Sequence, residues 1–109
     1  MQIQEIQFPQ GLVIGLTGRL DSATSPLLDA RLSVLIEGGE TRFVFDCVQL
    51  YYLSSAGIRV LLTTAKKVAP RGGRIALAAA KNHVLEVLNL GGLDMVFPHF
   101  ATVQAALSA

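Results

Sequence analysis

The feature that most constrains this fold is the unbroken apolar run Phe43-Val44-Phe45. A strand with one face in water alternates apolar and polar residues, whereas a strand covered on both faces is apolar throughout. We therefore expect this run to be a central strand of a sheet. A central strand buried on both faces needs helices on at least one side, so the chain is predicted to be a mixed α/β protein.

Hydrophobic periodicity places further strands around this one. Residues 2–8 alternate polar and apolar, and Leu12, Ile14 and Leu16 share one face of a second strand. The sequence Pro9-Gln10-Gly11 between them is typical of a turn, so these two strands are predicted to form a hairpin. Two later strands are expected at residues 75–79 and 94–97.

Four helices are expected, because apolar residues recur three and four positions apart. The predicted N-cap of the first helix is Thr24 or Ser25, and that of the second helix is Ser54 or Ser55. The predicted N-cap of the third helix is Asn82. The inward-facing residues are expected to be, in the first helix, Leu28, Leu32, Leu35 and Ile36; in the second, Ile58, Leu61, Leu62, Ala65 and Val68; in the third, Val84, Val87 and Leu88; and in the last, Phe100, Val103, Ala106 and Leu107. The resulting order of elements is β-β-α-β-α-β-α-β-α.

Length and composition exclude several classes of protein. The chain has 109 residues, which fits a single domain spanning residues 1–109. Its longest apolar run, Ile75 to Ala80, is far shorter than the ~20 residues of a membrane-spanning helix. The amino terminus lacks the profile of a secretory signal, and a net charge of +1 gives no electrostatic reason to expect nucleic acid as a partner. We expect a cytoplasmic protein without direct membrane insertion.

The cysteine and the histidines do not indicate a catalytic or metal centre. Cys47 is the only cysteine, and its expected place on a buried strand favours a core residue over a reactive thiol. His83 and His99 lack a spaced carboxylate pair that would complete a transition-metal site. The run from Leu53 to Gly57 lacks the first glycine of the Gly-x-Ser-x-Gly nucleophile motif. We expect no enzyme activity, no cofactor, no metal and no polar lining for a ligand pocket.

Hydroxyl and carboxyl side chains gather instead at two loop-to-helix junctions. Asp21, Ser22 and Thr24 precede the first helix, and Ser54 and Ser55 precede the second. Such junctions lie at the carboxyl ends of parallel strands, where α/β proteins usually place their sites, so we expect the two groups to share one face. A serine at a helix N-terminus either caps the helix or carries a phosphate. From the residues alone, both roles stay open for both serines.

Two segments resemble the signature of the STAS domain family, the fold of bacterial anti-sigma factor antagonists. They are Thr17-Gly18-Arg19-Leu20-Asp21 and, following Asp46 at the end of the central strand, Leu53-Ser54-Ser55-Ala56-Gly57-Ile58-Arg59-Val60-Leu61-Leu62. The expected order of elements matches that family over almost the whole chain. The resemblance implies a STAS-like α/β single domain with a mixed β-sheet and helices packed mainly on one face.

The resemblance also implies a function. In that family an anti-sigma factor serine kinase phosphorylates a serine at the start of the second helix, and a PP2C-like phosphatase removes the phosphate. The family's usual string is Asp-Ser-Ser/Thr-Gly. Aligning Gly57 with its glycine places Ser55 at the phosphate acceptor, Ser54 at the aspartate and Ala56 at the next hydroxyl. Ser54 is then expected to cap the helix. The partner-binding residues are expected to be Asp21, Ser22, Thr24, Ser54, Ser55, Gly57, Ile58 and Arg59.

Three functions remain open at this point. The first is an anti-sigma factor antagonist that binds its kinase when unphosphorylated and is inactivated by phosphorylation at Ser55. The second is a STAS partner-binding subunit of another signalling, secretion or transport complex. The third, a small-molecule sensor or enzyme, requires a concave pocket with convergent polar groups. An exposed apolar patch beside Ser55, including Tyr51, Tyr52 or Ile58, would support partner binding in either of the first two cases.

Overall fold

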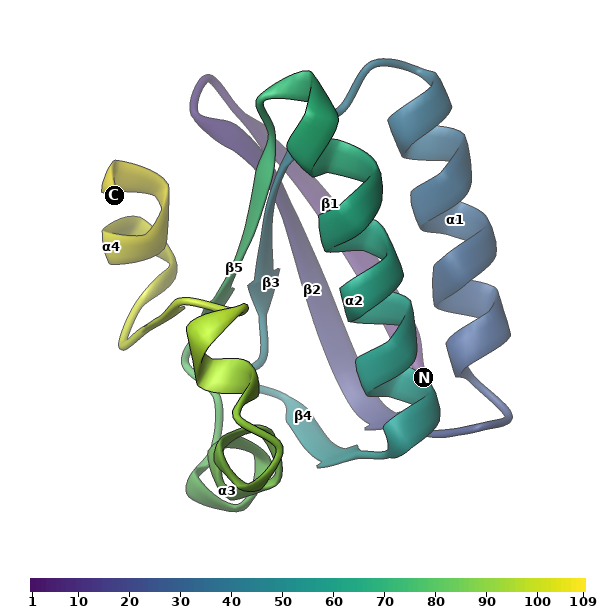
Figure 1. The fold of residues 1–109 in the computed structure, drawn as a ribbon, viewed down its shortest axis with the longest axis vertical. Helices are drawn as coiled ribbons and strands as arrows, with labels where there is room; N and C mark the ends of the chain where they lie inside the picture. Colours follow the sequence, from purple (N-terminus) through teal and green to yellow (C-terminus); the bar gives the residue numbers. More distant parts are fainter.

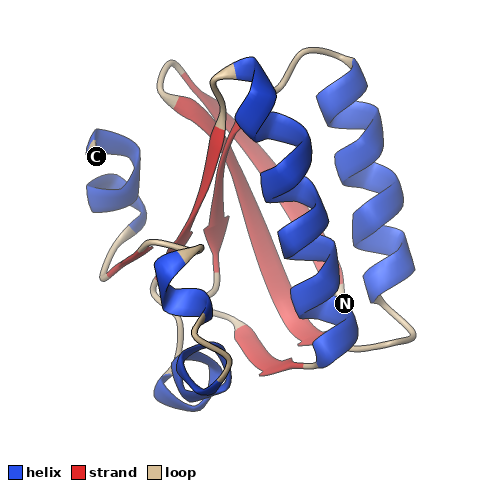
Figure 2. Cartoon of the chain, in the orientation of Figure 1, coloured by secondary structure: helices blue, strands red, loops and turns tan.

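The computed structural model describes residues 1–109 and contains six strands, four α-helices and two 3-10 helices (Figures 1 and 2). The strands are β1 (Gln2–Phe8), β2 (Gly11–Leu20), β3 (Arg42–Asp46), β4 (Leu50–Leu53), β5 (Arg74–Ala78) and β6 (His99–Phe100). The α-helices are α1 (Ser25–Glu37), α2 (Ser55–Val68), α3 (Asn82–Leu90) and α4 (Val103–Ser108), and the 3-10 helices are Ala69–Arg71 and Leu93–Met95. None of these helices combines the length and the hydropathy needed to cross a lipid bilayer.

The strands form one mixed sheet with β2, β3 and β5 at its centre (Figure 1). β1 and β2 make the predicted antiparallel hairpin, with Phe8 opposite Gly11. The pairings of β2 with β3, β3 with β5, β5 with β6 and β2 with β4 are all parallel. The predicted central strand is confirmed, because Phe43, Val44 and Phe45 of β3 are at most 5% exposed.

The helices cover the two faces of the sheet unequally. α1, α2 and α3 join the larger core, to which they contribute Leu28, Leu61 and Leu88. α4 alone lies on the opposite side of the sheet (Figure 1), where Ala106 and Leu107 pack in a second, smaller core. The prediction of a mixed α/β fold with helices mainly on one face is therefore confirmed.

The sequence prediction misses strand β4. Leu50 and Leu53 are buried, whereas Tyr51 and Tyr52 between them are exposed. Four residues in this order match neither an alternating strand nor a fully apolar one. The segment is a strand because it pairs with β2, which is distant in the sequence. The order of elements therefore gains one strand immediately before α2.

The last strand is also displaced from its predicted position. Residues 94–97 do not form a strand, since Leu93–Met95 is a 3-10 helix and the Phe97 side chain packs in the larger core. Strand β6 is instead the short segment His99–Phe100, which pairs with the end of β5. The final helix accordingly begins at residue 103, later than the apolar pattern indicates.

Two further details of the helices differ from the prediction. Asn82 is the first residue of α3 rather than its N-cap, a position taken by Lys81. Val87 of the same helix is 38% exposed instead of facing inward. In α2 the buried side chains include Val60 and Thr64, which the apolar spacing did not select. Thr64 is buried at little cost because its hydroxyl donates to the Val60 carbonyl at 2.9 Å.

Candidate functional site

Two strand ends bring the two hydroxyl-bearing junctions together. Leu20 and Leu53 are paired in the parallel register of β2 and β4, so Asp21 and Ser54 are the first residues after two neighbouring strands. The Ser54 N–H donates a hydrogen bond to the Leu20 carbonyl at 2.9 Å. α1 and α2 begin at this same edge of the sheet (Figure 1). The expectation that the two junctions share one face is therefore confirmed.

Ser54 and Ser55 have different environments. Ser54 is the N-cap of α2, with extended backbone angles, and its Oγ accepts a hydrogen bond from the Gly57 N–H at 3.3 Å. Ser55 is the first helical residue and is exposed, and its hydroxyl makes no hydrogen bond within the chain. The N-capping role expected of Ser54 is confirmed, and it leaves the Ser55 hydroxyl free to react.

Gly57 is needed at its position for close packing. A Cβ there would lie 2.7 Å from Leu20 Cγ and 2.9 Å from Leu53 Cδ1. No side chain fits at that separation unless both leucines move. Gly57 thus sets how closely α2 approaches the ends of β2 and β4, and with it the position of Ser55.

The loop before α1 is held together by Asp21 and Thr24. The Asp21 carboxylate accepts hydrogen bonds from the N–H groups of Thr24 and Ala23, at 3.1 and 3.0 Å. The Thr24 hydroxyl accepts from the Asp21 N–H and donates to the Arg19 carbonyl. The hydrogen bond from the Thr24 N–H contributes most to holding the pKa of Asp21 below its usual 3.8. Thr24 occupies the predicted N-cap position, but its side chain forms hydrogen bonds within the loop and none to the helix. Ser22 is the hydroxyl residue of this loop that is exposed.

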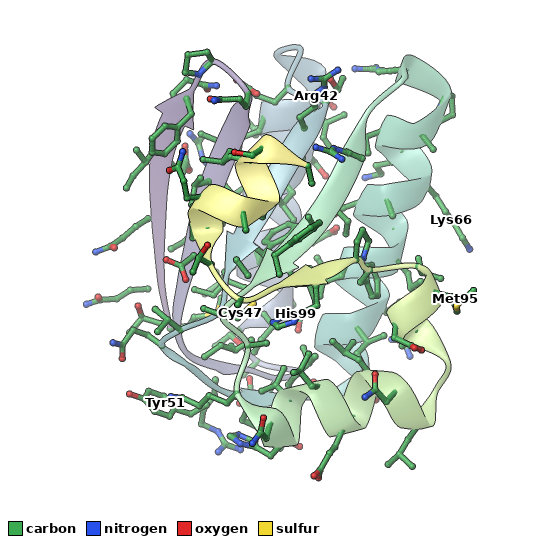
Figure 3. All side chains as sticks on the ribbon, turned by 90° about the vertical axis from the view of Figure 1, so that its left-hand side faces the viewer. Arg42, Cys47, Tyr51, Lys66, Met95 and His99 are labelled. Atoms are coloured by element: carbon green, nitrogen blue, oxygen red, sulfur yellow. The ribbon has the colours of Figure 1, made fainter.

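An aromatic strip lies along β4, next to the start of α2. Tyr51 and Tyr52 are 53% and 40% exposed, and Figure 3 shows Tyr51 at the edge of the molecule. The Arg19 guanidinium lies 4.1 Å from the centre of the Tyr52 ring, and Lys81 Nζ lies 4.9 Å from that of Tyr51. The His83 Nε2 lies 2.6 Å from the Tyr51 carbonyl oxygen. The two exposed tyrosines supply aromatic surface of the kind that would support partner binding. Sequence reasoning missed the cations beside them, because no local spacing links Arg19 and Lys81 to β4.

A groove between α1 and α2 reaches the same edge and has a volume of about 440 Å³. Its polar lining consists of Ser22, Ser25, Asp29, Arg59, Thr63 and Lys67. The expectation that the chain offers no polar lining for a pocket is therefore wrong, because the lining comes from two helices whose proximity the sequence does not reveal. Ser25 is only 3% exposed, and its hydroxyl has no hydrogen-bond partner.

Ile58 and Arg59 follow Gly57 in the first turns of α2 but differ in exposure. Ile58 is half-buried and packs against the larger core. Arg59 is exposed and takes part in neither ion pair of the chain. Of these two residues, only Arg59 is exposed.

The remaining nucleophile and bases have structural partners of their own. Cys47 is 2% exposed, and burial raises the pKa of its thiol to about 12, which confirms the core role predicted for it (Figure 3). His99 Nε2 accepts a hydrogen bond from the Ala80 N–H at 3.1 Å, and His83 contacts the Tyr51 carbonyl, so neither histidine bonds a serine. No three His, Cys, Asp or Glu side chains lie together in an arrangement suited to a metal ion.

Comparisons with known proteins agree with this arrangement. Residues 2–106 match the family described as STAS domain. BtrV of Bordetella bronchiseptica, a provisionally named anti-sigma factor antagonist, is 38% identical over 98 residues, which cover 90% of this chain and 84% of BtrV. The anti-sigma-F factor antagonist RsfB of Mycobacterium tuberculosis is 25% identical over 96 residues, covering 88% of this chain and 78% of RsfB.

The fold is also that of a solved structure. The anti-sigma factor antagonist SpoIIAA in its unphosphorylated form superposes with a TM-score of 0.85. The match covers 98% of this chain and 94% of that one at 24% sequence identity, a likeness that shows the fold. The family itself is settled by the match over residues 2–106 and by the 38% identity to BtrV. The chain belongs to the STAS domain family, and its relatives BtrV and RsfB carry the name of anti-sigma factor antagonists.

Proposed function

We propose that this chain is an anti-sigma factor antagonist switched by phosphorylation of Ser55. In the unphosphorylated form it binds an anti-sigma factor that is also a serine kinase, and so frees the sigma factor. Phosphorylation of Ser55 ends this binding, and a PP2C-like phosphatase restores it. The observation that carries the proposal is the exposed, unbonded Ser55 hydroxyl at the first position of α2, next to a serine that already caps the helix. The names of BtrV and RsfB support it.

The free fold can accept a phosphate on Ser55 without rearrangement. The phosphate adds about −1.5 to −2 charges, which the positive end of a helix dipole stabilises. The N–H groups of Ser55 and Ala56 have no acceptor within the chain, and the first turn of α2 contains no acidic residue. Because Ser55 is exposed, no packed side chain is displaced.

The same phosphate disfavours the binding of a partner through a closely fitted interface. A partner seated on this edge would cover Ser55 together with the exposed rings of Tyr51 and Tyr52. Removing a doubly charged group from water at the centre of such an interface costs ~2 kcal/mol or more, which is ~30-fold or more in affinity. Phosphorylation can therefore release a partner while the fold stays the same.

The partner-binding surface in this proposal is centred on Ser55. Its members with exposed side chains are Ser22, Ser55 and Arg59, and the aromatic strip of Tyr51 and Tyr52 extends it. The other proposed members hold the loop or the helix in position; they are Asp21, Thr24, Ser54, Gly57 and Ile58. A surface that combines an exposed acceptor, a second hydroxyl, a cation and two aromatic rings has the composition of a protein interface.

In this proposal the chain acts by binding and not as an enzyme. Residues 1–109 function as a single domain in the cytoplasm, where the sigma factor and its kinase work. The proposed partners include neither nucleic acid nor the membrane interior, and a net charge of +1 gives no electrostatic reason to expect a phosphate backbone as a partner. No cofactor enters the switch apart from the ATP that the kinase uses.

Phosphopeptide mapping tests the proposal. The chain is incubated with ATP and the histidine-kinase-like anti-sigma factors of its own organism, and tandem mass spectrometry then locates the phosphate. We expect one phosphate on Ser55 and none on the Ser55→Ala variant. The matched control, Ser54→Ala, should still be phosphorylated at Ser55.

Other results of this experiment contradict the proposed switch. Phosphate on Ser54 or Thr24 would show that the acceptor is misassigned. If no such kinase phosphorylates the chain, the alternative function gains support, namely a STAS partner-binding subunit of another signalling, secretion or transport complex. Neighbouring genes for a transporter would also support this alternative function.

A further inference from the structure

Arg59 is a cation without a counter-ion, one helical turn beyond Ser55. Neither ion pair of the chain includes it. α2 contains no acidic residue, so no charge on the same helix neutralises the guanidinium. Asp29 of α1 is the one carboxylate that lines the groove together with Arg59, and it does not come within ion-pair distance. The guanidinium is therefore available to an anion that arrives at this end of α2.

Helix geometry places Arg59 over Ser55. Residues four positions apart lie on the same face of a helix, with Cβ atoms ~6 Å apart. Side chains on a helix lean toward its N-terminus, so the long Arg59 side chain extends toward the turn that holds Ser55. A guanidinium presents paired donors that match two phosphate oxygens. Both residues are exposed, so no other side chain needs to move.

The neighbouring loop and the residue before Ser55 offer no competing partner for Arg59. The carboxylate of Asp21, on the neighbouring loop, accepts a hydrogen bond from the Thr24 N–H and lies 3.7 Å from Arg19. Its charge is thus largely matched within its own loop. The residue that precedes Ser55 in the chain is the neutral Ser54, and it is occupied by capping the helix. A phosphate on Ser55 would therefore meet Arg59 and the positive end of the helix dipole, with no carboxylate on α2 to oppose it.

We propose that Arg59 binds the phosphate of phosphorylated Ser55 within the free chain. The inference rests on the proposed function for the identity of the modified residue. In the unphosphorylated chain Arg59 is available to the partner; in the phosphorylated chain its guanidinium is engaged by the phosphate. Phosphorylation thus adds negative charge to the surface and at the same time withdraws a cation from it. The switch works as an intramolecular competition for Arg59.

The second ionisation of the phosphate measures this pairing. The second pKa of a phosphoserine is ~6, and a neighbouring cation lowers this pKa because it favours the dianion. Phosphoserine is introduced at position 55 during synthesis of the chain, so that no kinase is needed, and ³¹P NMR follows the titration of the free protein. We expect Arg59→Gln to raise the pKa of the phosphate by roughly 0.3 units.

A matched control separates the pairing from the general effect of removing a charge. Lys66→Gln removes the same charge from the last turn of α2, more than a Debye length from Ser55 in physiological salt, and should change the pKa of the phosphate by less than ~0.1 unit. Arg59→Lys retains the charge but loses the paired donors, so its value should fall between those of wild type and Arg59→Gln.

The outcomes distinguish this inference from the function on which it rests. Equal pKa values for wild type and Arg59→Gln, or equal shifts for Arg59→Gln and Lys66→Gln, would overturn the role of Arg59. Because the phosphoserine is installed by synthesis, this result does not depend on which residue a kinase modifies. A kinase that leaves Ser55 unmodified would instead refute the proposed function and leave the ³¹P measurement intact.

Discussion

Leu20 lies directly opposite Leu53 where β2 and β4 end side by side, and the two side chains leave room between them and α2 only for a glycine. This relationship positions the candidate site. It brings the loop that begins at Asp21 beside the N-terminus of α2, and it holds Ser55 at the surface of the molecule. The β4 strand, which local sequence patterns do not indicate, is therefore the element that assembles the site.

Replacing Gly57 with alanine tests this packing. The new Cβ would press on both leucines, and overpacking of this kind costs ~1–3 kcal/mol. Alanine is the better helix former by ~1 kcal/mol, so any net loss of stability reports the clash. We expect the urea midpoint of Gly57→Ala to fall with an unchanged slope. A variant more stable than wild type by the full ~1 kcal/mol of helix propensity would show that α2 moves away from the strand ends without cost.

The two serines should differ in their contributions to stability. Ser54→Ala removes the N-cap of α2 and should destabilise the chain by ~1 kcal/mol. Ser55→Ala removes an exposed hydroxyl without a partner and should change stability by less than ~0.5 kcal/mol. Ser54→Asp keeps a capping oxygen and should stay close to wild type. Chemical denaturation of the three variants checks the order, and a larger loss for Ser55→Ala would reverse the roles assigned here.

Partner binding should respond to charge at position 55 and not to loss of the hydroxyl. Under the proposed function, Ser55→Ala binds the anti-sigma kinase as tightly as the unphosphorylated wild type, and Ser55→Asp binds at least ~30-fold more weakly. Isothermal titration calorimetry with the purified kinase, in the absence of ATP, measures both affinities. Ser54→Asp introduces the same charge one residue away in a capping position and serves as the control. Equal binding by Ser55→Asp and Ser55→Ala would count against a charge-operated switch.

Stability should also depend on the protonation of His99. Burial holds the pKa of His99 below its usual 6.5, and its Nε2 must stay unprotonated to accept the Ala80 N–H. The unfolded chain thus binds a proton more readily than the folded chain. This contribution to stability is fully present above pH 6.5 and is lost as the pH falls from 6.5 through the lower folded-state pKa of His99.

Urea denaturation at a series of pH values from about 7.5 down to about 5 measures this effect. We expect His99→Gln to flatten the pH dependence in that range. His83→Gln, which leaves His99 and its contact with the Ala80 N–H in place, is the matched control. The carboxyl groups of Asp21 and Glu5, whose pKa values are lowered, titrate at more acidic pH and do not interfere. A slope that persists in His99→Gln would assign the effect to another group.

Much of the architecture could be predicted from local patterns. The apolar run at β3 indicated a strand buried on both faces, and it is buried. The spacing of apolar residues after Ser54 predicted α2 with a start within one residue of the observed one. The choice between Ser54 and Ser55 as N-cap needed the family resemblance, and the observed hydrogen bond to Gly57 agrees with it. These features depend on a residue's own conformational preference and on its neighbours within about one helical turn.

Other features were decided only by the tertiary structure. β4 and β6 are short strands that exist because β2 and β5 offer them hydrogen-bonding partners. The groove between α1 and α2, the cations beside Tyr51 and Tyr52, and the close fit of Gly57 against Leu20 all join residues that lie far apart in the chain. The sequence by itself determined which segments become strands or helices wherever the side-chain pattern was long enough to be read. Which strand ends lie side by side, and hence what surrounds Ser55, was decided by packing, because contacts between distant residues leave no periodic trace in the local sequence.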